Sequence, residues 1–175
     1  MNFRKGITAF LLGSVFVFSS VGVSEAYVKE GWKLPSKSAT YKWGDRLDDG
    51  SSIIKSGWQA ADSAWYTASR INFTVSSSSV NKLNSWFESS STYYGRMNTT
   101  YNTSTKKVTK FAGDINAGNT NITKSNVAKS TGVHEFGHAI GIGHNSGTSI
   151  MNSNRNRTTM HVPQTDDKNG VNAIY

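Results

Sequence analysis

The stretch TGVHEFGHAIGIGHNSGTSIM, residues 131–151, holds three of the four histidines of the chain within eleven residues. On a helix each residue advances by about 100°, so His134 and His138 lie about 40° apart on one face, one turn above the other. Two imidazoles placed in this way can bind one metal ion. Glu135 lies about 100° round from His134. That is a poor position for a third ligand and a suitable one for a base that acts on metal-bound water.

His144 is beyond the reach of a straight helix. Continuing the helix would place it about 15 Å along the axis from His134, whereas zinc binds imidazole nitrogens at about 2.0–2.1 Å. Gly141 allows the left-handed conformation that ends helices, and Gly143 adds freedom just before the histidine. We therefore expect the helix to end at Gly141 and the chain to fold back, so that His144 completes the metal site.

Three neutral imidazoles form an open zinc site with water in the fourth position, which is typical of a catalytic centre. A structural zinc site is usually closed by cysteines, and the chain contains none. We predict one catalytic Zn²⁺ bound by His134, His138 and His144. Glu135 is then the general base that takes the proton of the zinc-bound water as the water attacks a carbonyl.

The segment before the histidines predicts a mixed α/β domain. Apolar residues recur at steps of three and four in residues 51–70, which indicates a helix with Ser51 or Ser52 as its N-cap and with Trp58 and Trp65 in the core. Short β-type runs at residues 40–43 and 71–75 flank this helix. The order strand, helix, strand favours a crossover between parallel strands.

Residues 76–126 are rich in Ser, Thr and Asn and are expected to form loops around short strands, near residues 96–101 and 107–111. A last helix is expected after Val162, with Thr165 as its N-cap and two aspartates in its first turn, where carboxylates favour the helix dipole.

The chain begins with two cations, an apolar run at residues 7–18 and small residues up to Ala26, which is the order of a secretory signal peptide. The alternative, a membrane anchor, needs about 20 apolar residues. We expect cleavage after Ala26, a secreted, extracellular protein made of residues 27–175, and no membrane span after cleavage.

Composition restricts the partners. Removing residues 1–26 leaves 17 basic and 10 acidic residues, a net charge of +7. This charge serves solubility and permits association with an anionic cell wall. The cations are scattered and are not interleaved with stacking aromatics, so we expect no nucleic acid as a partner. We expect a monomer that acts on a protein or peptide substrate.

The chain resembles the metzincin peptidases. Their long zinc-binding motif, H-E-x-x-H-x-x-G-x-x-H, is matched at His134, Glu135, His138, Gly141 and His144. Met151 stands where metzincins have their Met-turn. Within this clan the chain is most similar to the matrixin (matrix-metalloprotease-like) family, over nearly all of residues 27–175.

This resemblance implies a twisted, mixed five-stranded sheet with three helices and an active-site cleft along an edge strand. It implies zinc ligation by the three histidines, a hydrophobic floor under the zinc from Met151, and bracing of the Met-turn by Asp166 or Asp167. Two features depart from the family. Residues 152–162 lack the Pro-x-Tyr of matrixin pocket walls, so substrate preference does not carry over. Acidic residues are sparse between Asp62 and Asp114, so a structural Ca²⁺ is not expected.

The predicted function is therefore a secreted zinc-dependent metalloendopeptidase. Two alternatives remain open from the sequence. One is a secreted zinc-binding or wall-associated protein without general proteolytic activity, although such a protein would need neither Glu135 nor an open coordination position. The other is a hydrolase of wall peptides, because the same water, base and zinc serve any amide.

Overall fold

A computed structural model describes residues 27–47 and 52–175 of the chain. The expected signal peptide, residues 1–26, lies outside the described residues, as does Ser51. In chain order the elements are β1 (Val28–Lys29), β2 (Ser38–Trp43), α1 (Ile53–Ser69), β3 (Asn72–Val75), β4 (Lys82–Trp86), β5 (Gly95–Tyr101), β6 (Val108–Asn116), the 3₁₀ helix η1 (Thr120–Thr123), α2 (Ser125–Ile140), β7 (Ile142–Gly143) and α3 (Thr165–Asn172). Across that same portion, no helix is long and apolar enough to cross a membrane.

The main sheet has five strands in the order β3-β2-β4-β6-β5. Strands β3, β2, β4 and β6 run parallel, and β5 pairs with β6 antiparallel at the edge of the sheet. The parallel pair β2 and β3 is joined through α1, so the predicted strand, helix, strand crossover is confirmed. The predicted fold class, a mixed five-stranded sheet with three helices, is also confirmed.

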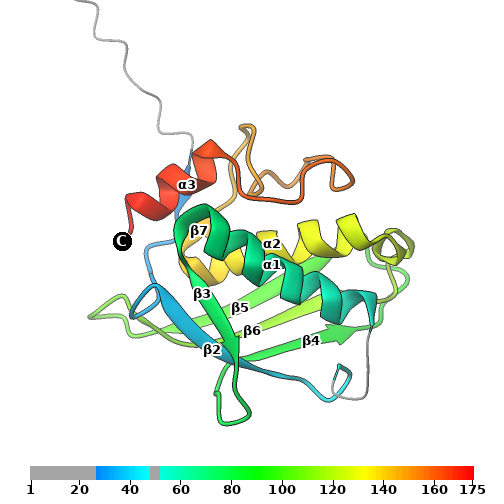
Figure 1. Ribbon diagram of the computed structural model, residues 1–175, viewed down its shortest axis with the longest axis horizontal. Helices are drawn as coiled ribbons and strands as arrows, with labels where there is room; N and C mark the ends of the chain where they lie inside the picture. The colour runs from blue at the N-terminus through cyan, green and yellow to red at the C-terminus, as the bar shows by residue number, and fades with distance from the viewer. Residues whose placement is uncertain (1–26, 48–51) are drawn as a thin grey trace, which may run out of the picture.

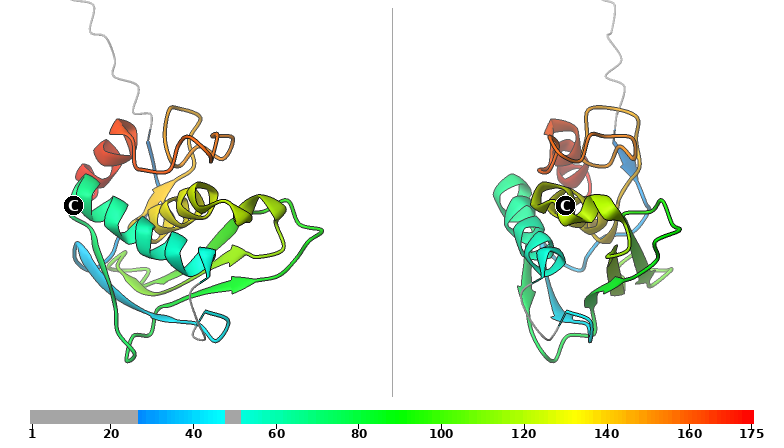
Figure 2. Two further views of the ribbon diagram at one scale, coloured as in Figure 1. Left: turned by 45° about the vertical axis from the view of Figure 1, so that its right-hand side comes forward. Right: turned by 90° about the vertical axis from the view of Figure 1, so that its right-hand side faces the viewer.

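Helices α1 and α2 lie side by side on one face of the sheet, and α3 lies beyond them (Figures 1 and 2). Their close approach requires glycine. A Cβ at Gly57 in α1 would lie 2.8 Å from the backbone carbon of Ala128 in α2. Helix α2 therefore packs directly against α1, and both helices contact the sheet.

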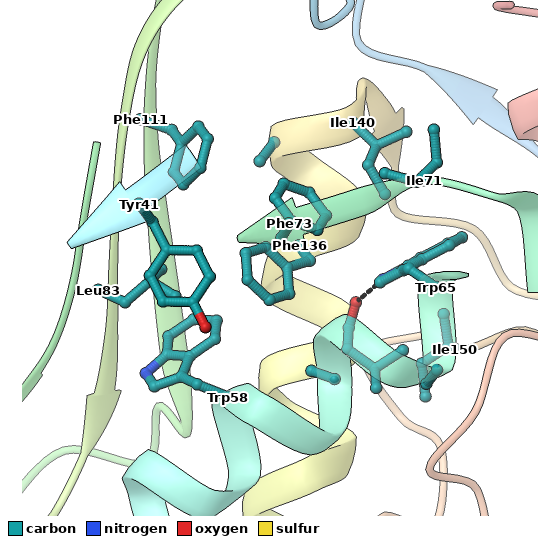
Figure 3. Close-up of a cluster of buried hydrophobic side chains, with 14 of the residues drawn as sticks. Tyr41, Trp58, Trp65, Ile71, Phe73, Leu83, Phe111, Phe136, Ile140 and Ile150 are labelled. Carbon is teal, nitrogen blue, oxygen red and sulfur yellow. Dashed lines mark hydrogen bonds between the residues drawn. The ribbon is translucent and has the colours of Figure 1, made fainter. Parts of the chain in front are cut away.

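The core lies between the helices and the sheet (Figure 3). The Phe136 ring of α2 stacks on Phe73 with 4.0 Å between ring centroids and meets Trp58 edge-on at 5.2 Å. The Trp65 indole nitrogen donates a hydrogen bond of 2.8 Å to the Val133 carbonyl, so α1 is also joined to α2 by a polar contact. Val133, Phe136 and Ile140 of α2 are fully buried in this core.

Two sequence predictions about strands were incomplete. Strand β4 was read as loop, because Leu83 is the one large buried apolar side chain in the sequence Lys82–Trp86 and Ser85 takes the other inward position. Strand β6 continues to Asn116, five residues beyond its predicted end, because it pairs with both β4 and β5. Pairing with two neighbouring strands stabilises a strand whose polar sequence does not by itself indicate β-structure.

Helix starts were predicted with mixed success. Ser52 is the N-cap of α1, and its side chain accepts a hydrogen bond of 3.0 Å from the Lys55 backbone N–H. The prediction of Thr165 as the N-cap of α3 was wrong, since Gln164 is the N-cap. The Asp167 carboxylate accepts a bond of 2.7 Å from the Gln164 backbone N–H, and this contact sets the start of the helix one residue earlier.

Candidate metal centre and cleft

Helix α2 carries the first two histidines and ends where the sequence predicted. Gly141 has φ +108°, and its N–H donates to the carbonyls of Gly137 and His138. A Cβ at position 141 would lie 2.1 Å from the Trp32 carbonyl oxygen, so both the dihedral angle and the space require glycine. The chain then enters β7, which pairs with β1 and leads directly to His144.

The three imidazoles converge. The His144 Nε2 lies 3.0 Å from the Nε2 of His134 and 3.1 Å from the Nε2 of His138. Nitrogens bound at about 2.0–2.1 Å to one tetrahedral zinc ion would be separated by roughly 3.3 Å. Within the described residues these three form the one group of His, Cys, Asp or Glu side chains close enough to hold a metal ion together.

The Nδ1 atoms of His134 and His138 already have hydrogen-bond partners within the protein. The His134 Nδ1 lies 2.8 Å from the Ile150 carbonyl oxygen, and the His138 Nδ1 lies 3.0 Å from the Glu30 carboxylate. The Ile150 carbonyl and the Glu30 carboxylate can only accept, so an N–H at each Nδ1 leaves the lone pair of the neutral ring on Nε2. The Arg155 Nη1 also lies 3.0 Å from the His134 Nδ1. Burial lowers the pKa of His134 well below its ordinary value, which favours this neutral state.

Three ring nitrogens that meet in this way can share one cation, and a donor set of three neutral imidazoles suits zinc. The histidine residues present therefore fit the predicted metal.

Glu135 is buried beside the histidines, with 5% of its surface exposed. Burial raises its pKa to about 7, and His138 and Arg155 partly offset this effect. The edge strand leaves room for the carboxylate only because residue 95 is glycine, since a Cβ there would lie 2.5 Å from the Glu135 Oε1. The absence of a side chain at Gly95 therefore allows β5 to lie close to the Glu135 carboxylate.

Met151 is fully buried against the middle of α2. A Cβ at Gly137, between the two histidines of the helix, would lie 2.3 Å from the Met151 sulfur, so Met151 packs directly against that stretch of α2.

Asp167 holds the turn that carries Met151. Its carboxylate accepts hydrogen bonds from the Ser149 hydroxyl, from the Ile150 N–H at 2.8 Å and from the Met151 N–H at 3.3 Å. Asp166 instead accepts one bond of 3.0 Å from the Asn145 amide. Of the two aspartates considered, Asp167 is the one that contacts the Met151 turn directly.

An open cleft of about 1110 Å³ contains the histidines and Glu135. Strand β5 forms one wall, and because β5 pairs only with β6 in the described sheet, its outer edge faces the cleft. The predicted cleft along an edge strand is thus observed. The opposite wall is formed by residues 153–157 and carries Arg155 and Arg157.

Sequence reasoning missed three residues of this site. Glu30 is separated from His138 by 108 positions, and nothing in its neighbourhood marks it as a partner. Arg155 is a buried residue of the cleft wall that donates to Ser130 and Asn152 and lies 3.0 Å from the His134 Nδ1, although it had been read only as one of several scattered cations. Gly95 carried no signal, because only the fold shows that a side chain there would displace Glu135.

Comparison with known families gives one match. The family model described as matrixin, peptidase M10, matches residues 33–175, which include the three histidines and Glu135 but not Glu30. No curated protein was found that matches the chain. The family match covers well over half of the chain, and the fold and the histidine cluster agree with it. The chain therefore belongs to the matrixin family of metallopeptidases.

Proposed function

We propose that the chain is a secreted zinc-dependent metalloendopeptidase in which His134, His138 and His144 bind the metal and Glu135 is the general base. The observation that carries the proposal is the convergence of three imidazoles beside a buried glutamate in an open cleft, with the His144 Nε2 about 3 Å from the Nε2 atoms of His134 and His138. Membership of the matrixin family supports peptide-bond hydrolysis and the use of zinc. Export rests on the sequence of residues 1–26 alone.

When held by the three histidines, a zinc ion would supply Lewis acidity to a water molecule or a carbonyl at the site. The residues of the chain supply the rest. The Glu135 carboxylate accepts a proton from the attacking water and passes it to the departing amine. Its burial and the elevated pKa suit a group that must both take and release a proton near neutral pH.

Substrate binding is served by the free edge of β5. An extended peptide can add to this edge through backbone hydrogen bonds, which orient any sequence in the same way. Glu30 and Ile150 hold the outer nitrogens of His138 and His134, so both rings keep their orientation while substrate enters.

The test uses protein expressed from the full chain and purified, with mass spectrometry to identify its N-terminus. Casein cleavage is measured with and without a zinc chelator, beside Glu135→Ala and the matched variant Glu88→Ala, which removes another carboxylate of the same cleft. We expect cleavage that is sensitive to the chelator, lost in Glu135→Ala and kept in Glu88→Ala, with zinc bound in all three proteins.

Two outcomes would contradict the proposal. If the protein binds one zinc ion yet cuts neither casein nor a broad peptide library, general proteolysis is wrong, and a zinc-binding or wall-directed role takes its place. If the exported product retains residues 1–26, the predicted cleavage after Ala26 is wrong.

A further inference from the structure

Arg157 lies on the cleft wall opposite β5 and is held against Tyr94. Its guanidinium carbon is 3.9 Å from the centroid of the Tyr94 ring, the distance of a stacked cation–π contact. One terminal nitrogen donates a hydrogen bond of 3.1 Å to the Ser153 carbonyl. These two contacts fix the plane of the guanidinium without neutralising its charge.

The hydrogen-bonding capacity of Arg157 is not used up. Its Nη1 makes no hydrogen bond with the described residues and is not buried, so it can reach a ligand in the cleft, whereas the Nε is buried and also lacks an acceptor. Burial also lowers the pKa of Arg157, which means that the cation has lost part of its hydration. A partly desolvated guanidinium with a free N–H is a binding site for a planar anion.

The other two arginines of the cleft differ in this respect. Arg96 pairs with Asp114 at 3.0 Å and is exposed. Arg155 has three of its nitrogens bonded to Ser130 and Asn152. Among the cleft arginines in the part of the chain described, Arg157 is thus the one that combines a free donor with no carboxylate within 4 Å.

The platform beneath Arg157 is itself rigid. The Tyr94 hydroxyl accepts a bond of 3.1 Å from the Asn121 amide, and the Tyr94 carbonyl accepts one of 2.8 Å from the Asn116 backbone. The Asn116 side chain is fully buried and donates to the carbonyls of Glu88 and Tyr93. The loop before β5 is therefore clamped, and the arginine site exists before any ligand arrives.

The arginine lies close to the reacting groups. Its charge contributes to the electrostatics of Glu135, and both residues line the same cleft. A substrate held along β5 with its scissile bond at Glu135 would place a neighbouring side chain within reach of Arg157.

We propose that Arg157, stacked on Tyr94, binds a substrate carboxylate next to the scissile bond, so that the enzyme prefers acidic peptides. This inference rests on the proposed peptidase function and adds the substrate class to it. The carboxylate has two sources in a peptide, an Asp or Glu side chain and the C-terminus, and the chemistry of recognition is the same for both.

The experiment measures kcat/KM for quenched peptides, blocked at both ends, in which Glu, Gln, Asp or Asn occupies each position around the cleaved bond. We expect the carboxylate to exceed its amide isostere at one position by about tenfold or more, the effect of one charge-assisted hydrogen bond in an enclosed site. Arg157→Leu should bring this ratio close to one, and Arg157→Lys should retain part of it. The matched control Arg96→Leu, an arginine of the same cleft, should keep the ratio of the unaltered enzyme.

Each result has a clear reading. Because the readout is a ratio within one protein, a general loss of activity cancels. A second set of peptides compares a free C-terminus with its amide, and a preference for the free acid that Arg157→Leu removes identifies the terminal carboxylate as the ligand. Ratios near one in both sets for the unaltered enzyme, or ratios that Arg157→Leu leaves unchanged, overturn the inference while the peptidase function stands. If no peptide is cut, the proposed function fails, and the same Glu-to-Gln ratio measured by calorimetric binding decides the inference by itself.

Discussion

Replacing Asp167 with asparagine tests how the last helix supports the metal site. The aspartate is fully buried, and its two oxygens accept four hydrogen bonds. One oxygen serves the Ser149 hydroxyl and the Met151 N–H, and the other serves the backbone N–H groups of Ile150 and Gln164. In asparagine one of these oxygens becomes an NH₂ group that faces two donors.

The expected loss follows from these contacts. A hydrogen bond to a charged group contributes about 1.5–3 kcal/mol, and a buried donor left without a partner costs about 1–3 kcal/mol. With two donors orphaned and the charge removed, we expect Asp167→Asn to lower the free energy of unfolding by about 4 kcal/mol. That is a large part of the roughly 5–15 kcal/mol that holds a domain together. The melting temperature should fall by about 10 °C.

The effect should reach the metal, because Asp167 holds the Ile150 N–H while the Ile150 carbonyl accepts from His134. We therefore expect zinc affinity to fall by about tenfold. Urea unfolding in the presence of a chelator measures the first effect, and competition with a chromophoric chelator measures the second. Asp166→Asn is the matched control, since it removes one bond to the Asn145 amide and should cost less than about 1 kcal/mol. Equal destabilisation by the two variants would refute the reasoning.

Two further predictions concern the neighbourhood of the metal. Glu30→Ala should weaken zinc binding by about 10- to 100-fold, because it removes the carboxylate that orients His138. The control Glu88→Ala should leave zinc affinity unchanged. Equal zinc affinities of the two variants in the competition assay would contradict the role of Glu30. Gly141→Ala should cost more than about 3 kcal/mol in urea unfolding or prevent folding, because φ is +108° and the new Cβ would lie 2.1 Å from a carbonyl oxygen. Gly31→Ala is its control, with φ +86° and nothing within 4 Å, and should cost only about 1–2 kcal/mol; similar losses for the two would show that space is not the limiting factor.

Much of the fold was predictable because its long elements carry strong patterns. The spacing of Trp58 and Trp65 located α1, and the end of α2 at Gly141 followed from the distance that His144 must cross. Strand β4 was missed because its residues gain their place from two neighbouring strands rather than from their own apolarity. The same reason applies to the second half of β6.

The metal-binding residues were predictable for a related reason. A helix fixes the distance between positions four apart, and the glycine in the motif indicates the turn that follows. The supporting residues were not. Glu30, Arg155 and Asp167 act through contacts between distant segments, and a single sequence contains no measure of such distances. The residue that supports the Met151 turn could be predicted only as Asp166 or Asp167, and only from the resemblance to matrixins. Arg157 is similar, because its chemistry depends on Tyr94 from the other wall of the cleft.

Helix α2 joins the core and the chemistry in one rigid element. Glu135 and Phe136 are adjacent in sequence and point about 100° apart, so the same backbone turn presents the buried base and the aromatic ring stacked on Phe73. Close packing of that ring leaves the turn little freedom to shift. The outer nitrogens of His134 and His138 are meanwhile held by groups from other segments, Ile150 and Glu30. The histidines are thus fixed from both ends, by the core through the backbone and by hydrogen bonds at the rings, so the arrangement of the site does not depend on the metal alone.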